Sequence, residues 1–545
     1  MATTATFNTQ RVGALPVIAE FCERLQLRKI VNDTVPWQGD VPLGDLVEIL
    51  VANRLLEPKP LYKLGSWASK ATLAQFYNLT EEMLHDDRIG RALERVAAHG
   101  DHVQAALVLH AIGEFDLDVR QVHYDLSTVE LYGAYADYEE GPLPAGTPRP
   151  AYGHTKSGRK DLKQIQFGIN VLKDGAVPIS HQAFDGNAAE SPTHLDNLKR
   201  LAQLLPKGEL LYLADSKLDA KANLLAVVAR KGKFLGGGAF TVEVQNLFRT
   251  VKDRLQPLDY SPKSQADLPA EQRDQYRGVE VRQEIRGLVE GTPICCKYRL
   301  LLLWSEAKAR QEAATRQRHL DKIRAEFGHI EKNLNRYRLK TLSDVQRRLE
   351  AAKRRYAEGK MFRYEVGQDR DGSLTLSWHI DSKELAHQEE LDGVFVLKTN
   401  LSKATHSTSD VLRTHKEQIQ VERRIGNLKG PLAVAPMYLK NPQRMAGLLF
   451  ILMWALMILA LMERQVRRRL AGKPMYGLYP ERRPSKAPTG VRLIEAFEYL
   501  CIILVEEGSQ TTRYLGDLDD TQRQILRLLD MHAGHIKTFK HKCGT

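Results

Sequence analysis

A run of apolar residues from Met445 to Met462 carries no charged side chain. It is long enough to cross a membrane as a helix, so the fold must either bury it or insert it into lipid. The run is single and directly follows a charged helical segment, and a large soluble core can enclose a helix that is apolar all round. We therefore expect a buried core helix, with a membrane-spanning helix as the alternative.

Positive charge is concentrated in one part of the chain. The 545 residues carry a formal net charge of +12, with a pI near 9.2. Between Glu306 and Lys360 there are 16 Lys and Arg against 8 Asp and Glu, a surplus of 8. Many basic enzymes act on ordinary substrates, but a surplus confined to one segment favours a dedicated surface for a polyanion.

The five cysteines include no CxxC pair and no cluster with histidines, so we expect neither a zinc site nor a disulfide framework. The first residues, Met1 to Asn8, have neither the basic nor the apolar region of a secretion signal. Both features are typical of a protein of the reducing cytoplasm.

From Val119 onward the pattern changes from helical to strand-like. Apolar runs predict strands at 119–126, 164–172, 176–184, 209–214 and 234–240, with helices at 193–205 and 219–230. Three antiparallel strands followed by helix, strand, helix and strand is the order of an RNase H-like mixed sheet. In that order the first and fourth strands are neighbours, so Asp125 and Asp215 are expected side by side at strand ends.

The segment from His415 to Lys429 is predicted to be one helix. At seven-residue spacing His415, Glu422 and Lys429 project from one face, together with Gln418. Taken alone, such a stripe is ordinarily a solvated charged face. Placed after two strand-end aspartates, Glu422 becomes a candidate third acid.

Two aspartates at neighbouring strand ends and a glutamate on a helix behind them are the ligands that two Mg²⁺ ions require, with Mn²⁺ as a substitute. Ions about 4 Å apart activate the attacking oxygen and stabilise the leaving oxygen in a displacement at phosphorus. Each acid alone could be a strand-end cap or a turn residue. In combination, Asp125, Asp215 and Glu422 predict phosphoryl transfer on nucleic acid.

The fold class expected is α/β, with an RNase H-like catalytic core interrupted by an α+β insertion domain. The regions are an all-helical N-terminal domain that binds DNA or only packs (1–113), the first part of the core (114–241), the insertion (242–392), the second part of the core (393–470), and a linker with a helical C-terminal region (471–545). The insertion has a pair of long charged helices at 307–356 and a hairpin at 362–380. Helices are expected at 491–505 and 521–532.

Several segments resemble bacterial insertion-sequence transposases of the DDE type, in the group with a Y-R-E-K signature and an insert before the glutamate. They are His123–Thr128, Gly153–Gln164, Asp185–Asn187, Leu213–Asp215, Asp392–Asn400, Gln420–Arg423 and Met437–Arg444. The resemblance runs from the first helices to about Leu470. It implies that Asp125, Asp215 and Glu422 bind the metal ions and that Lys429 contacts the DNA backbone near the transposon end.

Two positions depart from the signature Y-x2-R-x3-E-x6-K, because His415 stands at its tyrosine and Gln418 at its arginine. Lys416 and Arg423 are candidates to replace the arginine, although an ammonium is a point charge where a guanidinium is a planar fork. The departures motivate an alternative, a decayed or domesticated transposase that binds DNA without cutting it.

Further candidate DNA contacts lie in a basic loop and in the insertion. Lys156, Arg159 and Lys163 could follow a phosphate backbone, with a solvated loop as an equal alternative. Trp378 or Trp304 is a candidate to stack on an unstacked base, and for either one core packing is the favoured alternative.

The expected function is cleavage of one DNA strand at each terminal inverted repeat and transfer of the freed 3′-hydroxyl into target DNA. The expected partners are double-stranded DNA and further copies of the chain, in a homodimer or a larger synaptic complex, and not a membrane. The resemblance places the protein in the bacterial cytoplasm, at the nucleoid.

Overall fold

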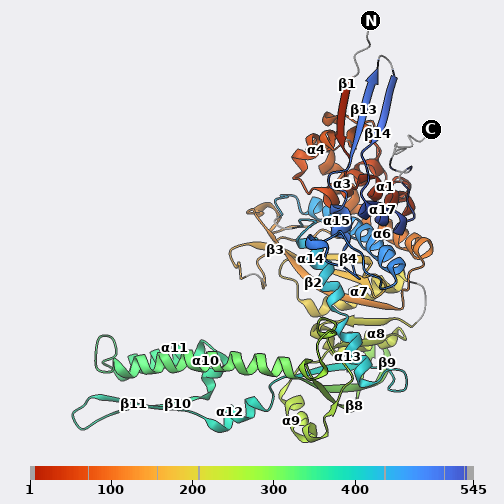
Figure 1. Cartoon of the computed structure of the whole chain (residues 1–545). Helices are drawn as coiled ribbons and strands as arrows, with labels where there is room; N and C mark the ends of the chain where they lie inside the picture. Colours follow the sequence, from red (N-terminus) through yellow and green to blue (C-terminus); the bar gives the residue numbers. More distant parts are fainter. Residues whose placement is uncertain are drawn as a thin grey trace. The chain divides into compact units, whose positions relative to one another are not determined.

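The computed structural model describes residues 6–71, 73–155, 158–205, 209–434, 437–507, 510–532, 534 and 536. The chain forms two compact units (Figure 1), each of which is described by itself. The first unit comprises Met1–Phe234, Gly287–Ile294 and Lys416–Thr545. The second unit comprises Leu235–Arg286 and Cys295–His415.

A mixed sheet organises the first unit. Its strands are β2 (Gln121–Leu131), β3 (Lys163–Leu172), β4 (Pro178–Phe184), β5 (Leu211–Ala214) and the start of β6 (Lys233–Gly237). They lie in the order β4-β3-β2-β5-β6. Strand β3 is antiparallel to β2 and β4, whereas β5 is parallel to β2. The predicted adjacency of the first and fourth core strands is therefore confirmed.

Helices α7 (Glu190–Leu204) and α8 (Lys221–Ala229) precede and follow β5, as predicted. Helix α7 buries residues at three- and four-residue spacing, which is the pattern of a helix lying on a sheet. Its Asn197 exchanges hydrogen bonds with Asn170 of β3 and donates one to the hydroxyl of Tyr212 in β5. The buried polar groups are thus paired, and they fix α7 across these strands.

The N-terminal region is mainly helical, as predicted. Its helices are α1 (Leu15–Arg24), α2 (Leu27–Thr34), α3 (Leu43–Leu56), α4 (Leu64–Lys70), α5 (Leu73–Phe76) and α6 (Asp86–Phe115). The prediction of an all-helical domain was wrong in one respect, because β1 (Thr6–Arg11) pairs with β13 (Cys501–Glu507) near the other end of the chain. A partner so distant in sequence leaves no local signal.

Helix α15 (Pro442–Leu470) contains the long apolar run. It is the one helix among the described residues that is long and apolar enough to cross a membrane. Its most apolar stretch of 18 residues has a mean hydropathy of 2.6 and is 100% buried within the protein. It packs against α3, α6 and β4, and Figure 1 draws it among these elements. Trp454 donates a hydrogen bond to Gln104 Oε1 at 2.9 Å. This burial accounts for the run as a core helix.

The helix predicted at 491–505 was wrong. Helix α16 spans only Gly490–Glu495, and after β13 the chain continues through β14 (Gln510–Leu515) to α17 (Asp520–Leu528). From Cys501 to Val505 deeper and shallower burial alternate, which is the two-residue period of a strand. Apolar β-branched residues favour a strand wherever a partner is present, and β13 has β1 and β14 on its two sides.

The strands of the second unit lie in the order β6-β12-β9-β8-β7, which is part of the nine-stranded order β4-β3-β2-β5-β6-β12-β9-β8-β7. The strands added here are β7 (Gln256–Pro257), β8 (Tyr276–Val289), β9 (Thr292–Ser305) and β12 (Val394–Thr399). Strand β12 is antiparallel to both β6 and β9. Shorter helices complete the unit, namely α9 (Val242–Val251), α12 (Ser382–Glu389) and α13 (Thr408–Lys416).

The predicted helix pair and hairpin of the insertion are confirmed (Figure 1). They are α10 (Glu306–Lys332), α11 (Leu342–Arg354), β10 (Phe362–Gln368) and β11 (Leu374–Ile380). Their shared core includes Phe327, Leu349 and Phe362. Because the apolar residues take one side of each helix, most of the Lys and Arg side chains of α10 and α11 are exposed.

Three histidines in the first unit are buried and uncharged. Burial lowers the pKa of His123, His181 and His194 to about 4, whereas histidine in an unfolded chain titrates near 6.5. Between these values the unfolded chain binds protons that the folded chain does not. The contribution of these groups to the free energy of unfolding is therefore fully present above pH 6.5 and is lost as the pH falls toward 4.

We expect the free energy of unfolding to fall by about 2 kcal/mol per histidine between pH 7 and pH 5, as measured by denaturant titration. His181→Phe should remove about a third of the total loss, because it removes one of the three titrating groups. Phenylalanine is a suitable replacement, since the His181 ring already packs edge-on against Phe450, with 4.4 Å between ring centroids. A free energy of unfolding that stays constant over this range would contradict the burial of neutral histidines.

Candidate catalytic site

The two predicted aspartates belong to neighbouring strands, Asp125 within β2 and Asp215 directly after the last residue of β5. Strands β2 and β5 run parallel, with His123 paired to Leu213, and Asp125 and Asp215 each follow two residues later. Parallel strands lie about 4.8 Å apart, so both aspartates stand at the same level beside one another. Asp125 is half-buried and Asp215 is exposed. This register supports the prediction that the sheet brings them together. The prediction that Asp125 ends its strand was wrong, because β2 continues to Leu131 through its pairing with β3.

Asp125 faces the side of the sheet on which His123 lies, because side chains two residues apart in a strand share a face. Asp215 Oδ1 accepts a hydrogen bond from Lys217 N at 3.0 Å, which caps a short 3-10 helix at Ser216–Asp219. Burial raises the pKa of Tyr124, and the negative charges of Asp125 and Asp215 raise it further.

The helix predicted from His415 to Lys429 is divided in two. Helix α13 ends at Lys416 and α14 (Ile419–Lys429) begins after a turn at 417–418. The prediction of one continuous stripe was therefore wrong: His415 lies on α13, whereas Glu422 and Lys429 lie on α14. The physical reason is that both side chains of the turn are bonded to other parts of the first unit.

Gln418 fastens the start of α14 to β2. Its Nε2 donates to Tyr124 O at 2.9 Å, and its Oε1 accepts from His123 Nδ1 at 3.1 Å. These are the two residues immediately before Asp125. Glu422 lies four residues, or about one helical turn, beyond Gln418. The residue that departs from the transposase signature thus positions the candidate third acid.

The contact continues through a hydrogen-bond chain. Gln121 Nε2 lies 3.0 Å from His123 Nε2 and 3.2 Å from Glu417 Oε2, and Glu417 also pairs with Lys173 at 3.2 Å. Since Gln418 offers His123 an acceptor and Gln121 offers it a donor, the histidine carries its proton on Nδ1. A neutral His123 is also what its lowered pKa requires.

Arg424 anchors the other side of α14. Its side chain is buried and donates to the carbonyls of Gly175 and Ala176 at 2.8 and 2.9 Å, and it pairs with Glu463 of α15 at 3.3 Å. Breaking a buried pair of this kind costs about 3–5 kcal/mol. Helix α14 is therefore held at its start by Gln418 and at its middle by Arg424.

The outward face of α14 carries the charged groups. Glu422, Arg423, Gly426 and Lys429 are exposed, whereas Val421, Arg424, Ile425 and Leu428 are buried. Among the described residues, Glu422 has no ion pair or hydrogen bond, in contrast to its neighbour Arg424. The carboxylate that the sequence predicts to bind a metal therefore makes no hydrogen bond or ion pair that stabilises the described fold.

The donor set fits a hard divalent cation, since all three predicted ligands are carboxylates. In the part of the chain that the structure describes, their oxygens do not form a group within 4.8 Å of one another. Carboxylates repel one another, and a bound cation is what draws them to coordination distance. The carboxylate chemistry of the three acids therefore makes them a candidate metal site.

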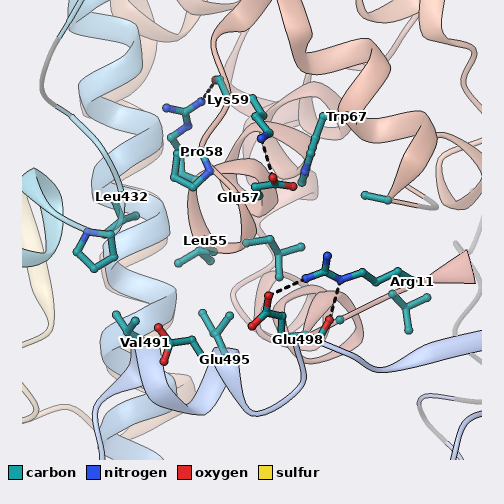
Figure 2. Close-up of a pocket in the computed structure, with 18 of the residues that line it drawn as sticks. Arg11, Leu55, Glu57, Pro58, Lys59, Trp67, Leu432, Val491, Glu495 and Glu498 are labelled. Carbon is teal, nitrogen blue, oxygen red and sulfur yellow. Dashed lines mark hydrogen bonds and ion pairs between the residues drawn. The ribbon is translucent and has the colours of Figure 1, made fainter.

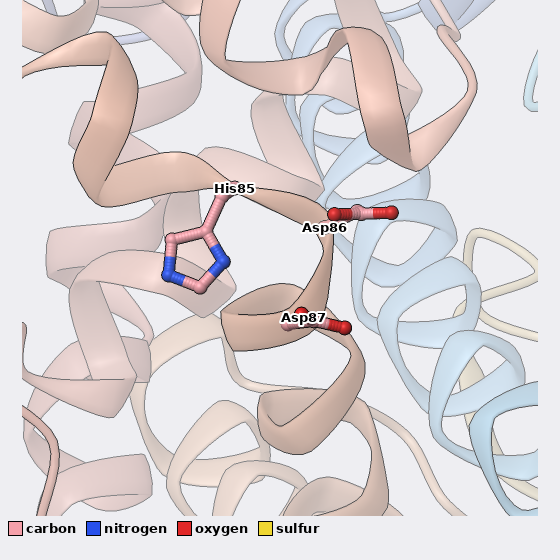
Figure 3. A group of neighbouring side chains, drawn as sticks. All are labelled: His85, Asp86 and Asp87. Atoms are coloured by element: carbon pink, nitrogen blue, oxygen red, sulfur yellow. The ribbon is translucent and has the colours of Figure 1, made fainter.

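A tighter group is formed by His85, Asp86 and Asp87, whose possible ligand atoms lie within 4.8 Å of one another (Figure 3). All three are exposed, and His85 caps α6 by accepting a hydrogen bond from Arg88 N. Asp86 and Asp87 occupy the first helical turn, where negative charge interacts favourably with the helix dipole. Helix capping accounts for this group.

In the predicted basic loop, Arg159 and Lys163 both form ion pairs with acidic residues of the same unit. Lys156 lies outside the described residues. Arg159 pairs with Asp161 at 2.7 Å. Lys163 is 5% exposed, pairs with Glu139 at 2.7 Å and donates to Ala134 O, so its ammonium is not presented at the surface.

The two tryptophans of the insertion both have partners. Trp378 lies against Phe327 and Phe362 and donates to Glu331 Oε2 at 3.1 Å. The guanidinium of Arg277 lies 5.4 Å from the ring centroid of Trp304. These contacts favour the packing alternative over a base-stacking role for either ring.

Sequence reasoning missed Gln418 and Arg424 as positioning residues. Gln418 was recognised only as a departure from a motif, although its four-residue spacing from Glu422 was visible. Arg424 lies between Val421, Ile425 and Leu428 on the apolar side of the helix. A charged residue at such a position predicts a buried partner, and that signal could have been used.

A family described as a domain of unknown function, DUF4277, matches residues 7–108. No curated protein matches the chain. Among solved structures the chain is similar to a piggyBac transposase in a synaptic complex with hairpin DNA. That similarity covers 90% of this chain and 82% of the other, at 8% identity and a TM-score of 0.39. Matches of this extent do not by themselves assign a function.

Proposed function

We propose that the protein is a DDE-type DNA transposase, which cuts and rejoins DNA at the ends of its own insertion sequence. One observation carries the proposal: Asp125 and Asp215 follow in-register residues of paired parallel strands, and Gln418 fastens the helix bearing Glu422 beside them. Three carboxylates on one face of an RNase H-like strand order suit two Mg²⁺ ions. The sequence motifs around these acids support the same assignment.

Bound Mg²⁺, or Mn²⁺ in its place, would polarise the scissile phosphate and help to ionise the attacking water. Asp125, Asp215 and Glu422 would hold the ions, and Gln418 would fix the turn that presents Glu422. Lys429 would pair with the DNA backbone beside the cut, while the exposed Lys and Arg of α10 and α11 would bind DNA elsewhere. We expect a homodimer or larger assembly, acting in the bacterial cytoplasm, to bring both ends together.

The test is an excision assay with a plasmid that carries the gene and its native flanking DNA. Mg²⁺-dependent cuts at flanking inverted repeats, with release of the element, are expected. Binding of the repeats in a gel-shift assay without any cut would instead favour a catalytically impaired transposase, which the replacement of the signature residues by His415 and Gln418 motivates. A chain that neither binds nor cuts the repeats would refute both functions.

Gly426 lies between Glu422 and Lys429 on the exposed face of α14. A Cβ placed there would meet no atom within 4 Å, and the backbone is not in the left-handed region. Neither packing nor backbone requires glycine, which costs a helix about 1 kcal/mol relative to alanine. A phosphate backbone that approaches α14 more closely than a methyl group allows is a physical reason for this residue.

We expect Gly426→Ala to raise the free energy of unfolding by about 1 kcal/mol while weakening end binding and cleavage by about fivefold or more. Gly113→Ala is the matched control, because Gly113 is also exposed within a helix with nothing inside 4 Å of its Cβ position. The control should gain stability and keep wild-type binding. Equal DNA binding by both variants would contradict a close approach at Gly426.

A further inference from the structure

A cavity of about 1000 Å³ opens in the first unit, away from the three acids (Figure 2). It is bordered by the end of α3 with the residues that follow, by α4, by the residues before α1, by Pro431 and Leu432, and by α16 with the turn after it. Its volume is at the upper end of the range for sites that take small organic ligands. The proposed catalytic function does not use it.

Arg54, in the wall of this cavity, is a buried cation without an anionic partner. The residue is 6% exposed, and its side chain donates to Asn53 Oδ1 and to Lys59 O, both of which are neutral acceptors. Its Nη1 has no acceptor among the described residues. Burial lowers the pKa of Arg54 to about 10. A buried charge without a counter-charge is costly, and an anion in the cavity would compensate it.

The lining has further uncompensated positive charge. Its three carboxylates are all engaged: Glu57 pairs with Lys59, Glu498 with Arg11, and Glu495 with Arg492. By contrast, Lys63 and Lys70 are exposed and form no ion pair with any described residue. Together with Arg54 they leave three positive charges at one cavity, which suits a dianionic phosphate better than a single carboxylate.

The rest of the lining is apolar. Leu55, Trp67, Leu432 and Val491 border the space in Figure 2, and Leu459 of α15 also lines it. Ligand sites commonly combine such walls with a few convergent polar groups. The guanidinium fork of an arginine matches phosphate oxygens in geometry. The ligand therefore needs a phosphoryl group joined to a body that can lie against apolar side chains.

We propose that this cavity binds a nucleoside phosphate, either as a free nucleotide or as the phosphorylated end of a DNA strand. Binding of a free nucleotide would be a property in addition to the proposed function. Binding of a DNA end rests on that function, because Pro431 and Leu432 lie two and three residues after Lys429, the last residue of α14.

The test is calorimetry and thermal unfolding without divalent metal, so that its outcome is independent of cleavage. The probes are dAMP, inorganic phosphate, and a four-nucleotide strand with and without a 5′-phosphate. We expect saturable binding of dAMP that exceeds binding of inorganic phosphate by about tenfold or more, because the nucleoside adds apolar contact. Tighter binding of the phosphorylated strand than of dAMP would assign the DNA end, and the reverse order would assign a free nucleotide.

Lys63→Ser/Lys70→Ser removes two exposed charges and spares the buried Arg54, so the variant should fold like the wild type. It should weaken dAMP by about tenfold or more. Lys199→Ser/Lys221→Ser removes two exposed charges of the same unit outside the cavity and should leave binding unchanged. Absence of saturable dAMP binding, or equal binding by both double variants, would overturn the proposal.

Discussion

Glu422→Gln should abolish Mg²⁺-dependent cleavage of the transposon ends while leaving end binding intact. Glu422 is exposed in the first turn of α14 and has no partner within the described chain. Glutamine keeps the shape of the side chain but loses the anionic oxygen that a hard cation prefers. The loss of about 4 kcal/mol of transition-state stabilisation corresponds to a rate reduced by about a thousandfold.

Glu20→Gln is the matched control, because Glu20 also lies on a helix of the first unit and makes no ion pair with any residue described. That variant should cut the ends like the wild type. Both variants should unfold at the wild-type temperature. Undiminished cutting by Glu422→Gln would remove Glu422 from the catalytic group.

Gln418→Ala should lower cleavage by about 10- to 100-fold, because Glu422 would lose the contact that sets its position. The variant leaves Tyr124 O and the buried Nδ1–H of His123 without their partner. An unsatisfied buried donor costs about 1–3 kcal/mol, so the free energy of unfolding should fall by a similar amount. Cleavage kinetics and denaturant titration measure the two effects on the same preparations.

Gln420→Ala is the matched control for Gln418→Ala, because it removes the same type of side chain two residues further along the chain. Its side chain has no hydrogen bond to any part of the chain that the structure describes. We expect it to keep both stability and cleavage. If Gln418→Ala cuts at the wild-type rate under conditions in which it is fully folded, then Gln418 does not position Glu422.

The strand order of the core could be predicted because its signals are local. Each strand is an apolar run bounded by turn residues, and the order of strands and helices restricts the neighbours that each strand can have. The adjacency of β2 and β5 then follows, and it brings the chain segments that carry Asp125 and Asp215 next to each other. The apolar α15 could likewise be assigned to the core from its single occurrence and its position.

The break between α13 and α14 could not be predicted, because it depends on contacts across nearly three hundred residues. Gln418 reaches Tyr124 and His123, and Glu417 reaches Gln121, none of which is near them in sequence. The pairing of β1 with β13 is of the same kind. Periodicity describes the faces of an element, but long-range partners decide where it begins and ends.

The central claim is that Asp125, Asp215 and Glu422 hold divalent metal together, and anomalous diffraction from crystals soaked in Mn²⁺ tests it most directly. We predict a strong Mn²⁺ peak between Asp125 and Asp215 on the face covered by α14, with Glu422 as a ligand. The same peak should be lost in Glu422→Gln crystals or much reduced. Mn²⁺ found only at the exposed group His85, Asp86 and Asp87, with none at the three acids, would contradict the account.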